Sequence, residues 1–374
     1  MSRLRVALDA TPLIGERTGV GVFCDGALRS LAAREDVAVS AFAISWRRRH
    51  AILELAPPGV GTGQRPIPAR PVHLAWRTLD VPPLDWFVPP SDVVHGTNFV
   101  VPPTRRAARV VTIHDLTMVR FPQMCTPATL SLLPLIRRSI GRGAFVHTPS
   151  EFVAAEVIEH FGADPARVVA VHHGVPTSDQ AAGSGGSLRA PDSPFILAVG
   201  TIEPRKDYPG LVRAFDSVAE LVPDVRLVIC GAAGWGADAF EAAVRRAAHA
   251  DRIDRLGYVT PGELGTLWSH ASAYCFPSVY EGFGLPPLQA MAAGVPVVAT
   301  SAGAVPEVVG DGAELVPPGD TEALAAALVR VLEDDDLRER LIAAGRTRAA
   351  GFTWDAAAEG LTALYRDALT AVTS

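Results

Sequence analysis

The sequence predicts an α/β protein with two domains, each built on a parallel, doubly wound sheet. Three observations support this fold class. The 374 residues exceed what one ordinary core accommodates and suit two domains. Short apolar runs alternate with helical stretches in both halves, as in parallel sheets connected by helices. A glycine- and serine-rich segment, 178–193, separates the two series and buries too little surface to fold by itself, so we expect a flexible linker there.

The first domain is expected over residues 1–177. Its buried-strand patterns are Leu4–Leu8, Val37–Ile44, Val93–His95, Val110–Ile113, Ala144–Val146 and Val168–Val171. A glycine-bearing turn, Gly15–Gly21, separates the first strand from a helix over Val22–Ala33, and Ser150–Phe161 is a further helix. Residues 56–90 are rich in proline and glycine without a clear period, so we expect a long irregular excursion.

The second domain is expected over residues 194–352. Strand patterns recur at Phe195–Val199, Val225–Ile229, Ile253–Leu256, Ala273–Phe276 and Val295–Ala299, and helical patterns at Tyr208–Leu221 and Ala237–Ala250. The tail, 353–374, reads as a helix that packs back toward the first domain. Two such domains leave a cleft between them, and ligands bind beyond the carboxyl ends of the strands.

Composition narrows the setting of the protein. The four cysteines lie far apart without metal-type spacing, which favours buried thiols in a reducing compartment. The amino-terminal residues do not form a secretory signal, and no run of about 18 apolar residues occurs, so we expect a cytoplasmic protein. Residues 1–176 carry 19 arginines against 14 acidic residues, whereas 177–374 are acidic. The basic half predicts either a solvated surface or peripheral contact with an anionic membrane or acceptor; we expect no nucleic-acid partner.

A first candidate site follows the opening strand of the second domain. The segment Gly200-Thr-Ile-Glu-Pro-Arg205-Lys206 places two cations after a tight turn and before a helix. Backbone N–H groups, a guanidinium and an ammonium together suit a diphosphate. By themselves the two cations would be a solvated pair, but their position after a strand favours a phosphate site.

A second candidate site is the segment Glu281-Gly-Phe-Gly-Leu-Pro-Pro-Leu-Gln289. Gly282 and Gly284 permit close approach of the backbone to a ligand. A helix is expected to begin near Leu288, so amides near Leu285 are predicted to face a phosphate. The alternative is a loop whose glycines serve packing only, with Glu281 as a carboxylate at the start of a helix.

These segments resemble the signature of the retaining family 4 glycosyltransferases, which have the GT-B fold of two Rossmann-like domains. The resemblance covers nearly the whole chain and includes Gly19-Val-Gly21, Thr112-Ile-His114-Asp115 and Thr148-Pro-Ser150-Glu151. Within the family, the pattern resembles bacterial mannosyl- and rhamnosyltransferases of surface polysaccharides. The resemblance implies a nucleotide diphosphate sugar as the donor, a glycan or lipid-linked hydroxyl as the acceptor, and no metal or other cofactor.

The resemblance also implies roles for particular residues. His114 and Glu281 would be the catalytic residues at the donor sugar. Gly19, Gly21, Arg205 and Lys206 would bind the donor diphosphate. Gly282, Phe283, Gly284 and Leu285 would contact the donor sugar and phosphate through the backbone. Gln289, Tyr258 and Val259 would bind the ribose and base.

Two departures from the family pattern concern the nucleotide. Gln289 stands where the family usually has a second glutamate, and an amide accepts a ribose hydrogen bond without carrying charge. Thr201 stands where many members have arginine, and we expect Arg205 to supply that charge. GDP-mannose is the first choice of donor, and a UDP-hexose is the next.

Other patterns indicate other functions less well. The first loop lacks Gly-x-Gly-x-x-Gly, which argues against a dinucleotide-dependent dehydrogenase. Neighbouring His172 and His173 point to opposite faces of a strand end and do not suggest a metal pair. The acidic run 334–336 is expected to cap a helix or to lie on a solvated surface, and not to bind a metal ion. The open alternatives are a sugar-nucleotide epimerase or phosphorylase of the same fold, and a non-catalytic sugar-binding module.

Overall fold

The computed structural model describes residues 3–15, 19–63, 65–175 and 188–373. The chain divides into two compact units, which we call unit 1 (1–174 with 353–374) and unit 2 (175–352). Residues 176–187, which include most of the predicted linker, lie outside the described residues. Each unit has one parallel sheet, so the predicted two-sheet α/β fold class is confirmed.

Unit 1 contains a seven-stranded sheet in the order β3-β2-β1-β4-β5-β6-β7. Its strands are β1 (Leu4–Asp9), β2 (Val37–Phe42), β3 (Gly61–Thr62), β4 (Val93–Gly96), β5 (Ala108–Thr112), β6 (Phe145–Thr148) and β7 (Val168–Ala170). Its helices are α1 (Gly19–Ala32), α2 (Ala51–Leu55), α3 (Ala69–Trp76), α4 (Thr117–Arg120), α5 (Pro127–Leu130), α6 (Leu133–Gly141), α7 (Glu151–Phe161) and α16 (Trp354–Thr373).

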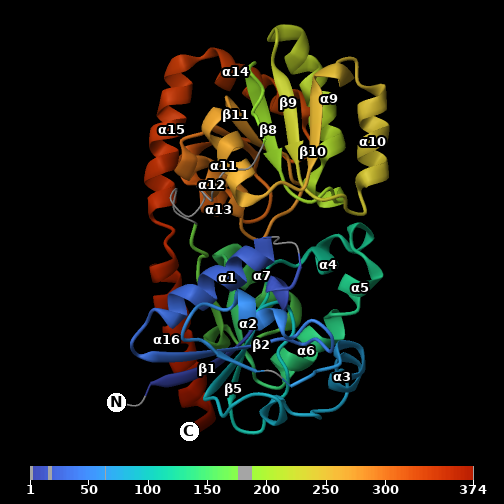
Figure 1. The fold of residues 1–374 in the computed structure, drawn as a ribbon. Helices are drawn as coiled ribbons and strands as arrows, with labels where there is room; N and C mark the ends of the chain where they lie inside the picture. Colours follow the sequence, from blue (N-terminus) through green and yellow to red (C-terminus); the bar gives the residue numbers. More distant parts are fainter. Residues whose placement is uncertain (1–2, 16–18, 64, 176–187, 374) are drawn as a thin grey trace. The chain divides into compact units, whose positions relative to one another are not determined.

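Both faces of this sheet are covered by helices. Side chains alternate along β1, so Val6 and Leu8 join the core beneath α1 and α16, whereas Ala7 joins the opposite core. Figure 1 shows α16 running beside α1 in unit 1. Glycine permits this packing, because a Cβ at Gly26 on α1 would lie 2.2 Å from the Trp354 ring.

Unit 2 contains a six-stranded sheet in the order β10-β9-β8-β11-β12-β13. Its strands are β8 (Phe195–Val199), β9 (Arg226–Cys230), β10 (Ile253–Gly257), β11 (Ala273–Phe276), β12 (Val297–Thr300) and β13 (Ala313–Val316). Its helices are α9 (Tyr208–Leu221), α10 (Ala237–Arg246), α11 (Pro261–His270), α12 (Leu285–Ala293), α13 (Val305–Val309), α14 (Thr321–Glu333) and α15 (Asp335–Ala350).

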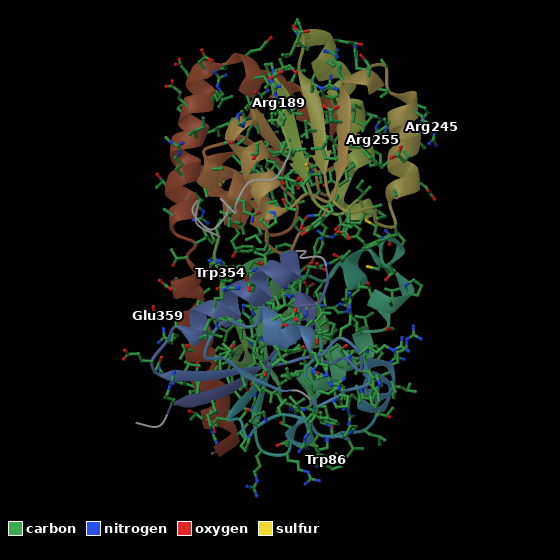
Figure 2. The ribbon with its side chains drawn as sticks, viewed as in Figure 1. Trp86, Arg189, Arg245, Arg255, Trp354 and Glu359 are labelled. Carbon is green, nitrogen blue, oxygen red and sulfur yellow. The ribbon has the colours of Figure 1, made fainter. Side chains whose placement is uncertain are left out.

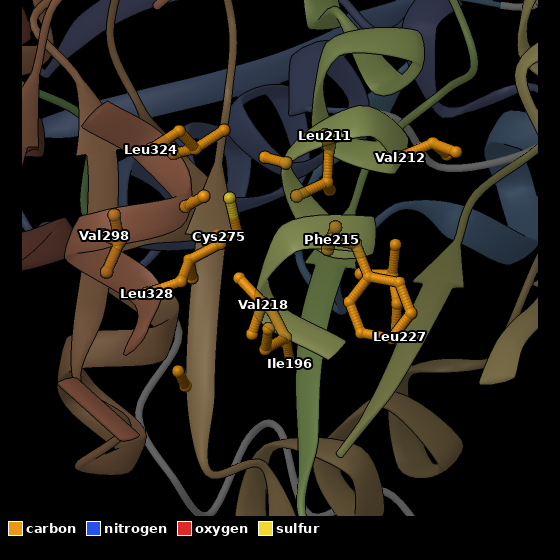
Figure 3. Close-up of a cluster of buried hydrophobic side chains, with 14 of the residues drawn as sticks. Ile196, Leu211, Val212, Phe215, Val218, Leu227, Cys275, Val298, Leu324 and Leu328 are labelled. Atoms are coloured by element: carbon orange, nitrogen blue, oxygen red, sulfur yellow. The ribbon is translucent and has the colours of Figure 1, made fainter. Parts of the chain in front are cut away.

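One core of unit 2 lies between the sheet and the helices α9 and α14. Leu211, Phe215 and Val218 recur at helical spacing on α9 and pack on the strands of the sheet (Figure 3). Leu324 and Leu328 reach the same core from α14. Burying this apolar surface fixes the strand ends that carry the predicted donor residues.

Three predictions about local structure are corrected. The predicted turn over residues 15–21 is too long, because α1 already begins at Gly19 and therefore contains Gly19 and Gly21. The predicted irregular segment 56–90 contains α3, whose buried Val72 and Trp76 are four residues apart, as on one face of a helix. The strand expected from Val295 begins at Val297 instead. By contrast, Asp334 caps α15 as predicted, since its side chain accepts a hydrogen bond from the N–H of Leu337.

Candidate active site

The predicted donor residues of unit 2 follow the two strands at which the strand order reverses. From β8 the order runs through β9 to β10, and from β11 it runs the other way through β12 to β13. Doubly wound sheets bind ligands at this switch point, beyond the carboxyl ends of the strands. After β8, Gly200 leads to a 3-10 turn over Pro204–Lys206, and after β11 come Ser278 and Glu281. Both predicted motifs therefore meet at one edge of one sheet.

Four charged side chains form a connected cluster at this edge. The Lys206 ammonium lies 2.5 Å from Glu281 Oε1, and Arg205 Nη1 lies 2.6 Å from Glu281 Oε2. The Nε atom of Arg205 lies 2.7 Å from Glu203 Oε1. Lys206 and Glu281 are only 7% and 6% exposed. Two cations are thus balanced by two carboxylates in a largely buried site, as charges away from water require.

The surroundings of Glu281 keep it ionised. Burial raises the pKa of this carboxyl, but the charges of Arg205 and Lys206 and hydrogen bonds from Lys206 and Ser278 outweigh burial and lower the pKa to about 2. Burial lowers the pKa of the Lys206 ammonium, and the Glu281 carboxylate opposes that effect. The Lys206 ammonium also lies 4.6 Å from the centroid of the Phe276 ring, a favourable cation–π distance.

Backbone contacts fix the two loops against each other. The N–H of Val279 donates to the carbonyl of Arg205, and the Arg205 guanidinium donates to the carbonyl of Tyr280. The turn that carries both cations ends at Asp207, which has a left-handed φ of 43° and caps α9 by accepting from the N–H of Gly210. The cations are therefore held on a short, hydrogen-bonded turn at the start of a helix.

The glycine segment after Glu281 is packed inside unit 2. Phe283 and Leu285 are buried, and α12 begins at Leu285 directly after Gly284, which has a φ of 125°. Pro286 and Pro287 have no N–H, so the donors at the start of α12 are the N–H groups of Gly284 and Leu285. Neither N–H donates a hydrogen bond within the described residues, and a helix start with such donors suits an anion.

The predicted ribose and base residues lie apart from the ion cluster. Gln289 is partly exposed on α12, Tyr258 is 47% exposed just after β10, and Val259 is partly exposed beside it. Within the described part of the chain, no hydrogen bond connects these three side chains to the Arg205–Glu281 cluster. Their assignment to the nucleotide stays a prediction.

In unit 1, His114 follows β5 and is held by its neighbours. Its Nε2–H donates to the carbonyl of Thr97, with 2.8 Å between nitrogen and oxygen. The rings of Phe23 and Phe99 pack edge-on against the imidazole, with centroids 5.4 and 5.8 Å away. Burial lowers the pKa of His114, so the ring is neutral at pH 7. Phe23 belongs to α1, which begins at Gly19. Gly19 is exposed and Gly21 is buried.

Sequence reasoning missed several residues that build these sites. Glu203 lies within the first motif, two residues before Arg205, and Ser278 lies three residues before Glu281, so their spacing offered a signal. Thr97 and Phe23 offered none, because their contacts with His114 join segments that are distant in sequence.

Two parallel sheets, with two cations after the first strand of one and a histidine after β5 of the other, are the arrangement expected of a GT-B glycosyltransferase. Comparisons with known proteins agree. Residues 17–179 match the family described as Glycosyltransferase Family 4, and residues 184–348 match the one described as Glycosyl transferases group 1. Sucrose-phosphate synthase from Thermosynechococcus elongatus has the same fold, with a TM-score of 0.77 over 99% of this chain and 100% of that one at 23% identity.

Two relatives are similar in sequence. An O-antigen chain mannosyltransferase B from Escherichia coli is 32% identical over 278 residues, which are 70% of this chain and 71% of that protein. A D-inositol 3-phosphate glycosyltransferase from Actinosynnema mirum is 35% identical over 223 residues, which are 56% of this chain and 54% of that protein. The chain therefore belongs to the family 4 glycosyltransferases, as its motifs predicted, and it is a glycosyltransferase.

Proposed function

We propose that the protein transfers a hexose, with mannose favoured, from a nucleotide diphosphate sugar to a hydroxyl of a glycan or lipid-linked acceptor, with retention at the anomeric carbon. The observation that carries this proposal is the buried Arg205–Lys206–Glu281 cluster at the switch point of unit 2. Buried cations beside a helix start are the groups that a donor diphosphate requires.

The cluster suits the chemistry of a leaving diphosphate. Breaking the bond between the sugar and the phosphate leaves negative charge on the phosphate oxygen, and fixed cations stabilise that charge in the transition state. We infer that the diphosphate shares Arg205 and Lys206 with Glu281, and that Glu281 then contacts a sugar hydroxyl. Two cations and the Gly284 and Leu285 N–H groups support a transfer that needs no metal.

Retention follows if the acceptor attacks from the face that the phosphate leaves. The C1–O bond to the phosphate breaks, the C1–O bond to the acceptor forms on the same face, and the leaving phosphate oxygen takes the acceptor proton. In this scheme His114 accepts a hydrogen bond from a sugar hydroxyl through Nδ1, since its Nε2–H is committed to Thr97.

Mannose is favoured because the E. coli relative carries the name of a mannosyltransferase. We expect saturating GDP to raise the melting temperature of the protein by several degrees, because it binds the folded state only. UDP and dTDP should raise the melting temperature less. Lys206→Ala should abolish the shift, whereas Arg255→Ala, at an exposed arginine of unit 2, should keep it. Selective stabilisation by UDP would contradict the choice of GDP-mannose.

Product analysis separates transfer from the alternative activities. An epimerase consumes the nucleotide sugar without an acceptor and releases another nucleotide sugar, and a phosphorylase needs inorganic phosphate. A glycosyltransferase releases the nucleoside diphosphate and a glycosylated acceptor. An epimerised nucleotide sugar from GDP-mannose alone would favour the epimerase.

We also propose peripheral contact of unit 1 with an anionic membrane. Six of the eleven large apolar side chains that are exposed in the described residues lie between Trp46 and Trp86. Arginines accompany them: the Arg105 guanidinium lies 5.4 Å from the centroid of the Trp86 ring, and Arg65 donates to the Trp86 carbonyl. Exposed tryptophans among arginines suit the headgroup region of an anionic bilayer. No helix among the described residues is long and apolar enough to cross a bilayer.

Vesicle flotation tests this contact. Trp86→Ala should lower the fraction bound to vesicles that contain phosphatidylglycerol by several-fold, because an aromatic anchor is lost. Trp235→Ala is the matched control, because Trp235 lies in unit 2 and is 51% exposed, close to the 48% of Trp86. Figure 2 shows Trp86 among the side chains of unit 1. Equal binding to neutral and anionic vesicles would refute the proposal.

A further inference from the structure

A continuous hydrogen-bonded chain runs through the core of unit 1. The hydroxyl of Tyr365 lies 2.7 Å from His95 Nδ1, and His95 Nε2 lies 2.7 Å from Thr112 Oγ1. The same oxygen of Thr112 lies 2.9 Å from His147 Nδ1. The chain ends at the carbonyl of Val171, 3.0 Å from His147 Nε2. All four side chains are fully buried, and they come from α16, β4, β5 and β6.

The end of the chain fixes the direction of every hydrogen bond in it. The Val171 carbonyl can only accept, so His147 carries its proton on Nε2 and accepts at Nδ1 from the Thr112 hydroxyl. Because that hydroxyl has one proton, it accepts from His95 Nε2–H, and His95 Nδ1 accepts from Tyr365. Both imidazoles are therefore neutral Nε2–H tautomers. Burial also lowers the pKa of both, that of His147 to about 3.

His114 lies directly beyond this chain on the same two segments. His114 lies two residues after Thr112, and Thr97 lies two residues after His95. The hydrogen bond between His114 and Thr97 therefore joins the same two segments as the one between His95 and Thr112, two residues further along each. The two levels are also joined through Phe23, whose ring stacks on His147 at 5.3 Å and packs edge-on against His114 at 5.4 Å.

We propose that the Tyr365–His95–Thr112–His147 chain is a positioning device for His114. It holds the His114 imidazole as a neutral Nε2–H tautomer, with Nδ1 turned into an acceptor for a substrate hydroxyl. This inference rests on the proposed function, in which His114 meets the donor sugar. Protonation of Nδ1 would convert the acceptor into a donor, so the positioning must keep His114 neutral in mild acid. Three further titratable groups of the described residues influence these side chains: Cys24 acts on Tyr365, Asp115 acts on His114, and His173 interacts with His114 and His147.

Tautomers are measured directly by NMR, without any substrate. In the full chain labelled with ¹⁵N-histidine, two-bond ¹⁵N–¹H correlations distinguish Nδ1–H, Nε2–H and imidazolium forms. We expect His95, His114 and His147, assigned through single His→Gln variants, to be neutral Nε2–H tautomers at both pH 7 and pH 5.5. An Nδ1–H tautomer at any of the three, or an imidazolium at pH 5.5, would overturn the proposal.

Kinetics test the positioning itself. Thr112→Val removes the hydroxyl that joins both histidines, and we expect kcat to fall about tenfold, as for a small misplacement of a reacting group, and the acid limb of the pH profile to move to higher pH. Thr112→Ser should restore both. Thr362→Val is the matched control, because Thr362 is buried on α16 and donates only to the Ala358 carbonyl.

The outcomes separate this inference from the proposed function. Identical pH profiles for Thr112→Val and Thr362→Val would overturn the positioning role. If the wild-type protein turned over no nucleotide sugar at all, the proposed function would fail, and the role assigned to His114 would fail with it. The NMR result would still decide whether the chain sets the tautomers.

Discussion

Glu281→Gln is expected to lower the free energy of unfolding of unit 2 by about 3–5 kcal/mol, the range for breaking a buried ion pair. The reason is that Glu281 neutralises two cations at once. Its two oxygens lie 2.5 Å from the Lys206 ammonium and 2.6 Å from the Arg205 guanidinium, and all three side chains are largely withdrawn from water. Glutamine keeps the shape but leaves an excess positive charge in a poorly hydrated site.

Denaturant unfolding with a matched variant checks this expectation. Glu241→Gln makes the same change at an exposed pair with Arg255 in the same unit, where we expect a loss below about 1 kcal/mol. Equal losses for the two variants would show that the cluster does not stabilise unit 2.

The same carboxyl predicts a dependence of stability on pH. Because the pKa of Glu281 is lowered to about 2 in the folded protein, its stabilisation is fully present above the pKa of an ordinary glutamate, 4.5. It is lost as the pH falls from there through about 2. Glu281→Gln should lack this part of the acid dependence, and an unchanged acid dependence would contradict the assigned ionisation.

Gly303→Ala is expected to lower the free energy of unfolding of unit 2 by about 2–4 kcal/mol and to impair the site, from backbone strain and overpacking together. Gly303 has a left-handed φ of 57°, and a Cβ there would lie 2.2 Å from the carbonyl oxygen of Glu281. That oxygen also accepts from the N–H of Ala304. The added methyl must therefore displace the backbone that carries the Glu281 side chain.

Gly319→Ala isolates the clash from the backbone strain. Gly319 also has a left-handed φ, 79°, but nothing lies within 4 Å of a Cβ built there. We expect this control to lose about 1 kcal/mol, the cost of alanine at a positive φ. Melting curves of both variants, with GDP binding as a second readout, measure the difference. If Gly303→Ala lost no more stability than Gly319→Ala, the backbone at Glu281 would accommodate the added methyl without cost.

Sequence periodicity predicted the sheets well because buried parallel strands are short apolar runs bounded by turns. Phe195–Val199 and Ala273–Phe276 were predicted residue for residue. It failed over residues 56–90, where α3 is only eight residues long and the prolines and glycines of the surrounding segment obscure the helical period. It also placed the start of α1 too late, because glycines at positions 19 and 21 favour a turn unless tertiary packing fixes them.

The site was predictable only as far as its motifs reach. Arg205, Lys206 and Glu281 were recognised separately, but 75 residues separate Lys206 from Glu281, and no local pattern shows that they pair. Only the strand order, which puts β8 beside β11, brings them together. The chain from Tyr365 to His147 was invisible for the same reason, since 270 residues separate Tyr365 from His95.

Donor turnover by three variants tests the central claim most directly. The claim is that Arg205, Lys206 and Glu281 hold the donor diphosphate of a sugar transfer. Release of GDP from GDP-mannose is measured at a temperature where circular dichroism shows each variant folded. We expect Lys206→Ala and Glu281→Ala to lose turnover by about 100-fold or more, as when a group that stabilises transition-state charge is removed, and Arg255→Ala to match the wild type. Unchanged turnover in Lys206→Ala and Glu281→Ala would contradict the account.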